Sequence, residues 1–259
     1  MHRGAERKMP ACAKHDFWSR LMKTSVKSRI KLSDMNLNSE LKFGSMIDLI
    51  QDCINHQSES AGLGVKHQIS TKKSWILSSW YIEIEGQFEY DEEVVISTWP
   101  YEFKGVCGRR NATIARVGSE NECIIKVDSL WAVYDMEQGR LTRVPDEDAR
   151  LYSGEEPLEM NYQRKKILKG NSYEKKDSFT VRKYQMDFNR HMNNAWYIKI
   201  AEEYVEKNSR VKAVRAEYKK AALLGETINS YVSYEEDRVV VELRNDTDEV
   251  FAIMEFRYQ

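Results

Sequence analysis

The sequence predicts an α+β fold in which one unit, a helix followed by a meander of strands, occurs twice. Apolar residues recur at spacings of three and four in residues 46–54 and again in residues 196–205, as expected for amphipathic helices. Several short segments rich in aromatic and β-branched residues follow each stretch. Because the same order recurs, we expect a duplicated domain with one continuous antiparallel sheet and two long central helices.

In the first unit, the helical pattern gives way near Ser60 and strands follow. The first predicted strand, residues 75–84, alternates in polarity. We expect four of its apolar side chains on one face: Ile76, Trp80, Ile82 and Ile84. Three further strands are predicted over residues 94–99, 112–117 and 124–133.

The second unit repeats this order after Asn194. Its four strands are predicted over residues 211–217, 227–234, 239–243 and 250–258. A D-x-N pattern precedes each helix, starting at Asp34 in the first unit and at Asp187 in the second. Aligning these two residues gives an offset of 153, whereas aligning Met46 with Trp196 gives 150. We interpret the difference as a short loop insertion.

The repeat divides the chain into four parts. Residues 1–16 are polar and aperiodic, and we expect a flexible tail there. Residues 17–150 form the N-terminal unit and residues 178–259 the C-terminal unit. Between them, residues 151–177 are dense in charge and show no sustained period, so they are interpreted as a linker.

Composition limits the classes of partner. The chain has 259 residues, 41% hydrophobic residues and a formal net charge of -1. A net charge near zero argues against non-specific binding to nucleic acid or to an anionic membrane. No apolar run reaches the roughly 20 residues of a membrane-spanning helix, and we expect a cytoplasmic protein. The four cysteines lack metal-binding spacing, so we expect reduced thiols, no metal site and a core position for Cys53.

The polar stretch before the second helix carries the chemistry. Asp187, Asn189 and His191 stand at alternate positions, so on an extended segment their side chains would point the same way. Asn193 and Asn194 follow where the helix begins, and backbone N–H groups at such a position suit an oxyanion. These residue types are also common in Asx turns and helix caps, which is the alternative interpretation.

The motif DxNxHxNN at residues 187–194 resembles the active-site motif of plant and bacterial acyl-acyl-carrier-protein (acyl-ACP) thioesterases. A helix wrapped by an antiparallel meander, present twice, likewise resembles their double (tandem) hot-dog fold. Other segments match in order: Thr98-Trp99-Pro100, Gly108-Arg109-Arg110, Ser129-Leu130-Trp131 and Arg143-Val144-Pro145. The resemblance extends over roughly residues 17–259.

The resemblance implies hydrolysis of a fatty acyl-ACP thioester by activated water, with acyl carrier protein as partner, no cofactor and a homodimer as an option. It implies that His191 acts as base or acid, because an imidazole exchanges protons near neutral pH. Asn189 would orient the water or the acyl carbonyl, and Asp187 would fix the geometry of the motif. The first unit, with Asn38 aligned to His191, would supply the acyl pocket.

One departure from the family matters. The family's catalytic glutamate falls at Ala221, and the position where some members carry a cysteine is Ala222, which excludes covalent catalysis there. Glu217 lies four positions earlier, roughly 13 Å away on an extended strand. Two alternatives therefore remain open: an acyl-CoA thioesterase, and a binding protein that holds acyl chains without hydrolysing them. A hot-dog dehydratase is disfavoured, since no matching motif is present.

The resemblance also suggests secondary sites. Arg109 and Arg110 match a family motif and are predicted to bind the carrier protein or its phosphopantetheine, with internal pairing to an acidic residue as the alternative. Five tryptophans either line an acyl tunnel or fill a packed core: Trp75, Trp80, Trp99, Trp131 and Trp196.

Overall fold

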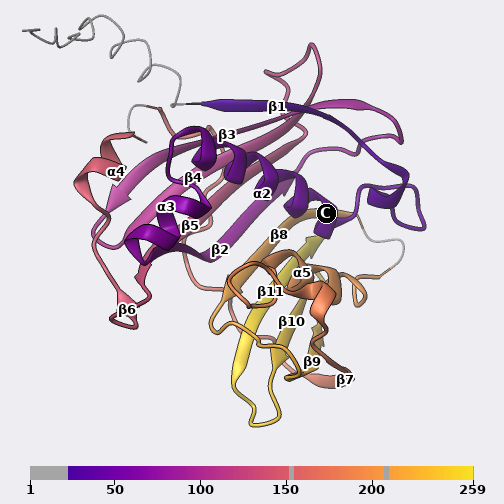
Figure 1. Ribbon diagram of the computed structural model, residues 1–259. Coiled ribbons are helices and arrows are strands. Elements are labelled where there is room, and N and C mark those ends of the chain that lie inside the picture. The colour runs from indigo at the N-terminus through magenta and orange to yellow at the C-terminus, as the bar shows by residue number, and fades with distance from the viewer. Residues whose placement is uncertain (1–22, 152–154, 207–209, 259) are drawn as a thin grey trace, which may run out of the picture.

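A single antiparallel sheet of eleven strands runs through both units in the computed structural model, which describes residues 23–151, 155–206 and 210–258 (Figure 1). The strand order is β1-β3-β4-β5-β2-β8-β11-β10-β9-β7, and β6 pairs with β5. The α+β class and the continuous sheet are as predicted. The predicted tail, residues 1–16, lies outside the described residues.

Each unit contributes one set of elements. The N-terminal unit contains β1 (Thr24–Arg29), the 3₁₀ turn η2 (Leu32–Asp34), α2 (Phe43–Ser60), α3 (Val65–Thr71), β2 (Lys73–Ile84), β3 (Glu93–Lys104), β4 (Cys107–Arg116), β5 (Ile125–Asp135), β6 (Arg140–Leu141) and α4 (Asp146–Leu151). The C-terminal unit contains β7 (Glu174–Thr180), the 3₁₀ turn η3 (Lys183–Gln185), α5 (Asn194–Glu202), β8 (Val211–Tyr218), β9 (Thr227–Tyr234), β10 (Arg238–Arg244) and β11 (Val250–Tyr258).

All eight predicted strands are present, and three were missed: the edge strands β1 and β7 and the two-residue strand β6. β1 alternates between half-buried and exposed residues, and β7 is mostly charged or polar, so neither has the apolar composition that predicts a strand. Because β7 begins at Glu174, the connection between the units ends at Tyr173 and not at residue 177. No helix in the described ranges is long and apolar enough to cross a membrane.

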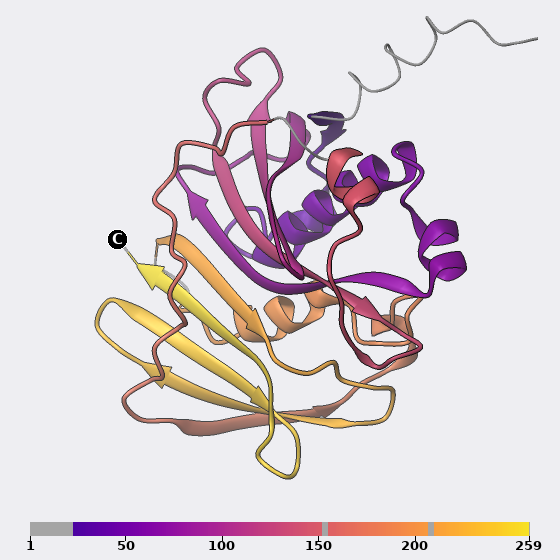
Figure 2. The same ribbon diagram turned by 90° about the vertical axis from the view of Figure 1, so that its left-hand side faces the viewer.

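The two units join where β2 pairs with β8, from Ser79 opposite Glu217 to Glu83 opposite Ala213. Helices α2 and α5 lie on the same side of the sheet (Figure 2). The apolar stripe of α2 faces the core, as its spacing predicts, and Cys53 on that stripe is buried. Burial raises the pKa of the Cys53 thiol to about 11, which disfavours the reactive thiolate.

Helix α5 is shorter than predicted. It ends at Glu202, and the next residues form a tightened turn in which the Tyr204 N–H donates to Ala201 O at 3.2 Å and the Val205 N–H donates to Glu202 O at 3.1 Å. The helical spacing of Tyr204 and Val205 therefore reflects this turn. Of the two central helices, only α2, with 18 residues, is long.

A bulge in β2 changes the predicted orientation of one side chain. The pairing of β2 with β5 shifts register between Leu77 and Ser79, so the residues before the bulge face the other way. Leu77 is buried and Ile76 is exposed, whereas Trp80, Ile82 and Ile84 face the core as predicted.

The structure fixes how the two units correspond. An isolated bridge joins Met35 to Leu41, and another joins Met186 to Met192, so equivalent residues are 151 positions apart. Ser39 and Arg190, which share this offset, both have positive φ. The predicted offset of 153 is therefore wrong.

The corrected offset changes the comparison between the two motifs. Asn36, and not Asp34, is the counterpart of Asp187, and Glu40, and not Asn38, is the counterpart of His191. Asp34 belongs to the preceding 3₁₀ turn. The predicted alignment rested on two residue types, Asp and Asn, and such a short sequence pattern recurs by chance. The turn is the more reliable guide to equivalent positions, which explains the misalignment.

The helices α2 and α5 pack antiparallel about a local pseudo-twofold axis. Asp48 and Lys199 occupy equivalent positions and form an ion pair with each other at 2.6 Å. Beside them, the Glu202 carboxylate at the end of α5 accepts N–H groups from Phe43 and Gly44 at the start of α2, at 3.1 and 3.2 Å. A Cβ on Gly44 would collide with the Lys199 side chain, so this close approach requires glycine.

The connection between the units crosses the face of the sheet that lies away from α2 (Figure 2). Its first part is held by the N-terminal unit: the Trp99 indole N–H donates to Glu156 O, and the Leu158 N–H donates to the Asn111 side chain, both at 2.9 Å. Its second part is held by the C-terminal unit, where Arg215 donates to Lys165 O. The connection therefore fastens the two units together.

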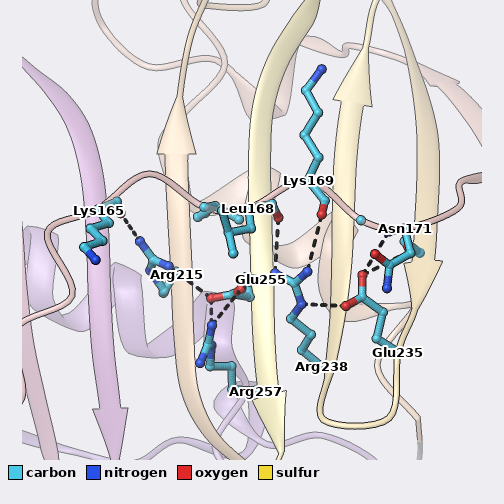
Figure 3. A network of polar contacts seen from close by, with 12 residues as sticks. Lys165, Leu168, Lys169, Asn171, Arg215, Glu235, Arg238, Glu255 and Arg257 are labelled. Atoms are coloured by element: carbon cyan, nitrogen blue, oxygen red, sulfur yellow. Dashed lines mark hydrogen bonds and ion pairs between the residues drawn. The ribbon is translucent and has the colours of Figure 1, made fainter.

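A buried carboxylate organises the second attachment (Figure 3). Glu255 on β11 is fully buried and is bonded by Arg215, Arg238 and Arg257. Arg238 also donates to the carbonyl oxygens of Leu168 and Lys169 in the connection. Burial raises the pKa of the Glu255 carboxyl, but the hydrogen bonds from Arg257 and Arg238 outweigh burial and leave the pKa below its ordinary value.

We predict that Glu255→Gln lowers the free energy of unfolding by about 3 kcal/mol at neutral pH, because the buried guanidinium groups of Arg215 and Arg238 and the partly exposed one of Arg257 lose their counter-charge. Urea unfolding measures the loss. The pKa of Glu255 is lowered on folding, so this stabilisation is present above the ordinary pKa of 4.5 and disappears as pH falls below it. The difference between the two proteins should shrink over that acidic range.

Glu174→Gln is the matched control, since Glu174 forms an exposed ion pair with Lys176 on the edge strand. It should cost less than about 1 kcal/mol. Equal losses in the two variants, or no loss in Glu255→Gln, would contradict the role assigned to Glu255.

Candidate functional site

The DxNxHxNN motif forms a tight turn and not the extended segment that was predicted. The Asp187 N–H donates to His191 O at 2.8 Å, and the Arg190 N–H donates to Asp187 O at 3.1 Å. Arg190 has a φ of 64°, which reverses the chain direction. The alternate side chains of the motif therefore do not all point the same way.

Two motif residues hold this local structure. The Asp187 carboxylate accepts the His191 backbone N–H at 3.1 Å, and the Asn193 side chain caps α5 by accepting the Ala195 N–H at 2.9 Å. These are the turn and cap roles that the sequence left open. Behind the turn, burial raises the pKa of Tyr197 to about 12, and the negative charges of Glu226 and Asp187 act in the same direction.

A cavity of about 180 Å³ lies beside the turn and takes its walls from both units. The N-terminal unit supplies most of the lining, including an aromatic wall formed by Trp75, Phe103 and Trp131. The C-terminal unit supplies the start of α5 and part of the motif turn. The site is thus a junction between an aromatic wall and a polar turn.

The cavity collects four of the five predicted motif residues. Asp187, Asn189, Asn193 and Asn194 line it, and His191 does not. Asp187 is the only carboxylate among the described residues that line the cavity. His191 is exposed at the end of the turn, and its imidazole has no hydrogen-bond partner in the described part of the chain. His191 therefore lies outside the cavity lining, on the turn whose neighbouring residues Asn189 and Asn193 line it.

The segment with the missing glutamate lies against the motif. The Met192 N–H donates to Ala222 O at 2.9 Å, and the Ala222 N–H donates to the Tyr197 hydroxyl at 2.8 Å. Ala221 itself is exposed and outside the cavity lining. The position of the family's glutamate is therefore next to the turn that carries His191.

Neither nearby acid replaces that glutamate. Glu217 accepts the Ile167 N–H at 2.6 Å and pairs with Lys219, so it is occupied by the connection between the units. Glu226 accepts the Leu223 N–H at 2.7 Å. Neither residue lines the cavity.

The two arginines of the Gly108-Arg109-Arg110 segment have internal partners. Arg109 pairs with the buried Asp128 at 2.9 Å, and burial is the largest cause of the raised pKa of Asp128. Arg110 is buried and donates to the side chains of Gln57 and Thr98. Both residues also contribute to the cavity lining. Internal pairing, the alternative from the sequence, accounts for Arg109, and carrier binding by either arginine stays a prediction.

The tryptophans divide between the two predicted roles. Trp75 and Trp131 line the cavity, whereas Trp80 and Trp99 are buried. Trp196 packs edge-on against Tyr184, outside the cavity.

Sequence reasoning missed the polar wall that α2 contributes. Gln51, Asn55 and Ser58 all line the cavity and stand at spacings of four and three on α2. This is one stripe of a helix, next to the apolar stripe that the sequence revealed. A search for polar residues at helical spacing would have found it.

Comparison with known proteins identifies the architecture. A crystal structure of an acyl-ACP thioesterase from Bacteroides thetaiotaomicron matches with a TM-score of 0.81 at 17% identity, over 92% of this chain and 98% of that one. The 12:0-ACP thioesterase from Umbellularia californica matches with a TM-score of 0.78 at 13% identity, over 92% and 97%. The predicted tandem hot-dog fold is confirmed.

Two curated plant proteins are similar in sequence. The chain is 22% identical to the chloroplastic oleoyl-acyl carrier protein thioesterase of Coriandrum sativum over 228 residues, which is 80% of this chain and 62% of that protein. It is also 22% identical to oleoyl-acyl carrier protein thioesterase 2 of Arabidopsis thaliana over 233 residues, or 82% and 63%. The chain thus matches less than two thirds of the length of these relatives.

Family models cover most of the chain. Residues 22–152 match the acyl-ACP thioesterase N-terminal domain, and residues 169–258 match the acyl-ACP thioesterase C-terminal domain. With both domains present in the family's order, the chain belongs to the acyl-ACP thioesterase family.

Proposed function

We propose that this protein hydrolyses the thioester of a fatty acyl chain carried by acyl carrier protein. The observation that carries the proposal is the position of Asp187, the one carboxylate among the described residues that line a cavity with an aromatic wall and several side-chain amides. An acyl chain suits the aromatic wall, and a thioester suits the polar turn. Family membership supports the same reaction.

The reaction adds water across the bond between the acyl carbon and sulfur. The water oxygen attacks the carbonyl carbon, one proton leaves the water, and the carbonyl π electrons move onto oxygen. The carbon–sulfur bond then breaks, and the thiolate takes a proton. The products are a fatty acid and the carrier thiol. Such a step needs a base, a donor for the oxyanion and a proton for sulfur.

The motif turn supplies the proton transfers in this proposal. Asp187 takes the proton from the attacking water, because it is the carboxylate that faces the cavity. Asn189 lines the cavity beside it and orients the water or the acyl carbonyl. His191, exposed beside the cavity, gives a proton to the departing thiolate. The cycle closes when Asp187 releases the proton of the water to solvent and His191 takes one up from solvent. The hydrogen bond from the His191 backbone N–H to the Asp187 carboxylate fixes the position of Asp187 relative to His191.

We predict that Asp187→Asn and His191→Ala each lower kcat by about 10²-fold or more, the usual cost of losing a proton-transfer group. The measurement is release of free thiol from a panel of acyl-ACP and acyl-CoA substrates. Asp187→Asn keeps an oxygen that can accept the His191 N–H, so its thermal midpoint should stay near that of wild type. Unchanged turnover in both variants would refute the proton-transfer roles.

The same panel separates the alternatives. Faster turnover of acyl-ACP than of the matching acyl-CoA supports the proposal, and the reverse order identifies an acyl-CoA thioesterase. Tight binding of acyl carrier without turnover identifies a protein that holds acyl chains.

A separate prediction concerns the missing glutamate. Because Ala221 adjoins the segment that bonds to the motif at Met192, Ala221→Glu places a carboxylate next to the turn. We expect kcat to rise severalfold, with Ala221→Gln as the uncharged control. A rise in both variants would point to a steric effect, and no rise in either would show that the site works without an acid at this position.

A further inference from the structure

The amide of Gln51 is one of the polar groups of the cavity that the proposed reaction leaves unused. Gln51 lies on α2 and lines the cavity together with Asn193 and Asn194. Its Nε2 atom is shielded from solvent and has no hydrogen-bond partner in the described part of the chain. A buried N–H donor without an acceptor is costly, so such a group is usually completed by a ligand or a neighbour.

The pseudo-twofold axis explains why Gln51 is there. Gln51 and Glu202 are 151 positions apart and are therefore equivalent, as are Phe43 and Asn194. Glu202 accepts the N–H groups at the start of α2. By the same symmetry, Gln51 faces the start of α5, and the shared cavity lining places it there.

The two equivalent positions differ in hydrogen-bonding capacity. A carboxylate only accepts, so Glu202 closes the start of α2 from within the protein. A carboxamide carries one acceptor oxygen and two N–H donors, and only the oxygen could bond to the N–H groups of a helix start. Gln51 makes no such bond in the described part of the chain, and the Asn194 N–H has no partner there either, so the start of α5 stays open. Two residues with unpartnered N–H donors thus line one cavity.

Donors without acceptors suit a ligand oxygen that gains negative charge. We propose that Gln51 is a catalytic residue whose Nε2 donates a hydrogen bond to the thioester carbonyl oxygen and stabilises the oxyanion formed by water attack. This proposal rests on the proposed hydrolysis and adds a residue from the N-terminal unit to a site carried by the C-terminal unit. The carboxamide stays neutral and loses no proton in the cycle.

The test is Gln51→Met, which keeps the length of the side chain and removes both donors. We expect kcat for the best acyl-ACP substrate to fall by about 10²-fold or more, as for loss of one oxyanion donor, with KM changed by less than about threefold. Gln51→Glu keeps the shape and puts a negative charge against the oxyanion, so its kcat should fall at least as far. A wild-type value of kcat in Gln51→Glu would overturn the proposal. This outcome decides the question even if Gln51→Met does not fold.

Gln68→Met is the matched control, because Gln68 lines the same cavity from α3 and its Oε1 accepts from Ser74. The proposal requires kcat to fall at least tenfold further in Gln51→Met than in Gln68→Met. Equal falls would mean that any polar wall residue has this effect, and the assignment of Gln51 would be wrong.

A second measurement distinguishes this proposal from the proposed function. The infrared carbonyl stretch of an isotope-labelled acyl thioester of pantetheine is recorded when bound to each protein, with a non-hydrolysable amide analogue if turnover is fast. A bound carbonyl that accepts from Gln51 absorbs at lower frequency, and that shift should be lost in Gln51→Met and kept in Gln68→Met. If wild type is inactive but the frequency shift is still lost in Gln51→Met and kept in Gln68→Met, hydrolysis is refuted and the hydrogen bond from Gln51 to the carbonyl is supported. The same frequency in wild type and Gln51→Met would refute the donor, whatever the turnover.

Discussion

The structure depends on the antiparallel contact between α2 and α5, and above all on the carboxylate of Glu202 at the start of α2. Burial raises the pKa of this carboxyl, and the N–H groups of Gly44 and Phe43 oppose that shift. A buried carboxyl is tolerated here because two backbone donors and the positive end of a helix dipole meet it. The contact fixes the two helices in register and closes one of the two equivalent helix starts.

That closure makes two similar units unequal. A duplicated domain with a true twofold axis would have two identical sites, one at each helix start. Here Glu202 fills the first from within, and Glu40 stands where the second unit carries His191. The start of α5 is left facing the cavity. Accordingly, the N-terminal unit contributes most of the cavity lining, and the C-terminal unit contributes the polar motif turn.

The sequence predicted the elements that follow from periodicity, and it singled out a motif of which four residues line the cavity. Helical and alternating patterns depend on burial, which a single sequence records directly. The geometry of the motif depends instead on the positive φ of Arg190, for which an arginine gives no warning. The bulge near Ser78 was missed for a similar reason, since it depends on the pairing of β2 with β5 and leaves no mark in composition.

The cavity was the least predictable feature, because residues far apart in sequence build it. Gln51 and Asp187 come from different units and meet only because the helices pack antiparallel and β2 pairs with β8. Because the aromatic wall comes from the N-terminal unit and the motif turn from the C-terminal unit, neither unit alone contains the site. The connection fastened to Arg215 and Arg238 then matters for chemistry as well as for stability, because sliding of one unit along the other would separate the aromatic wall from the carboxylate.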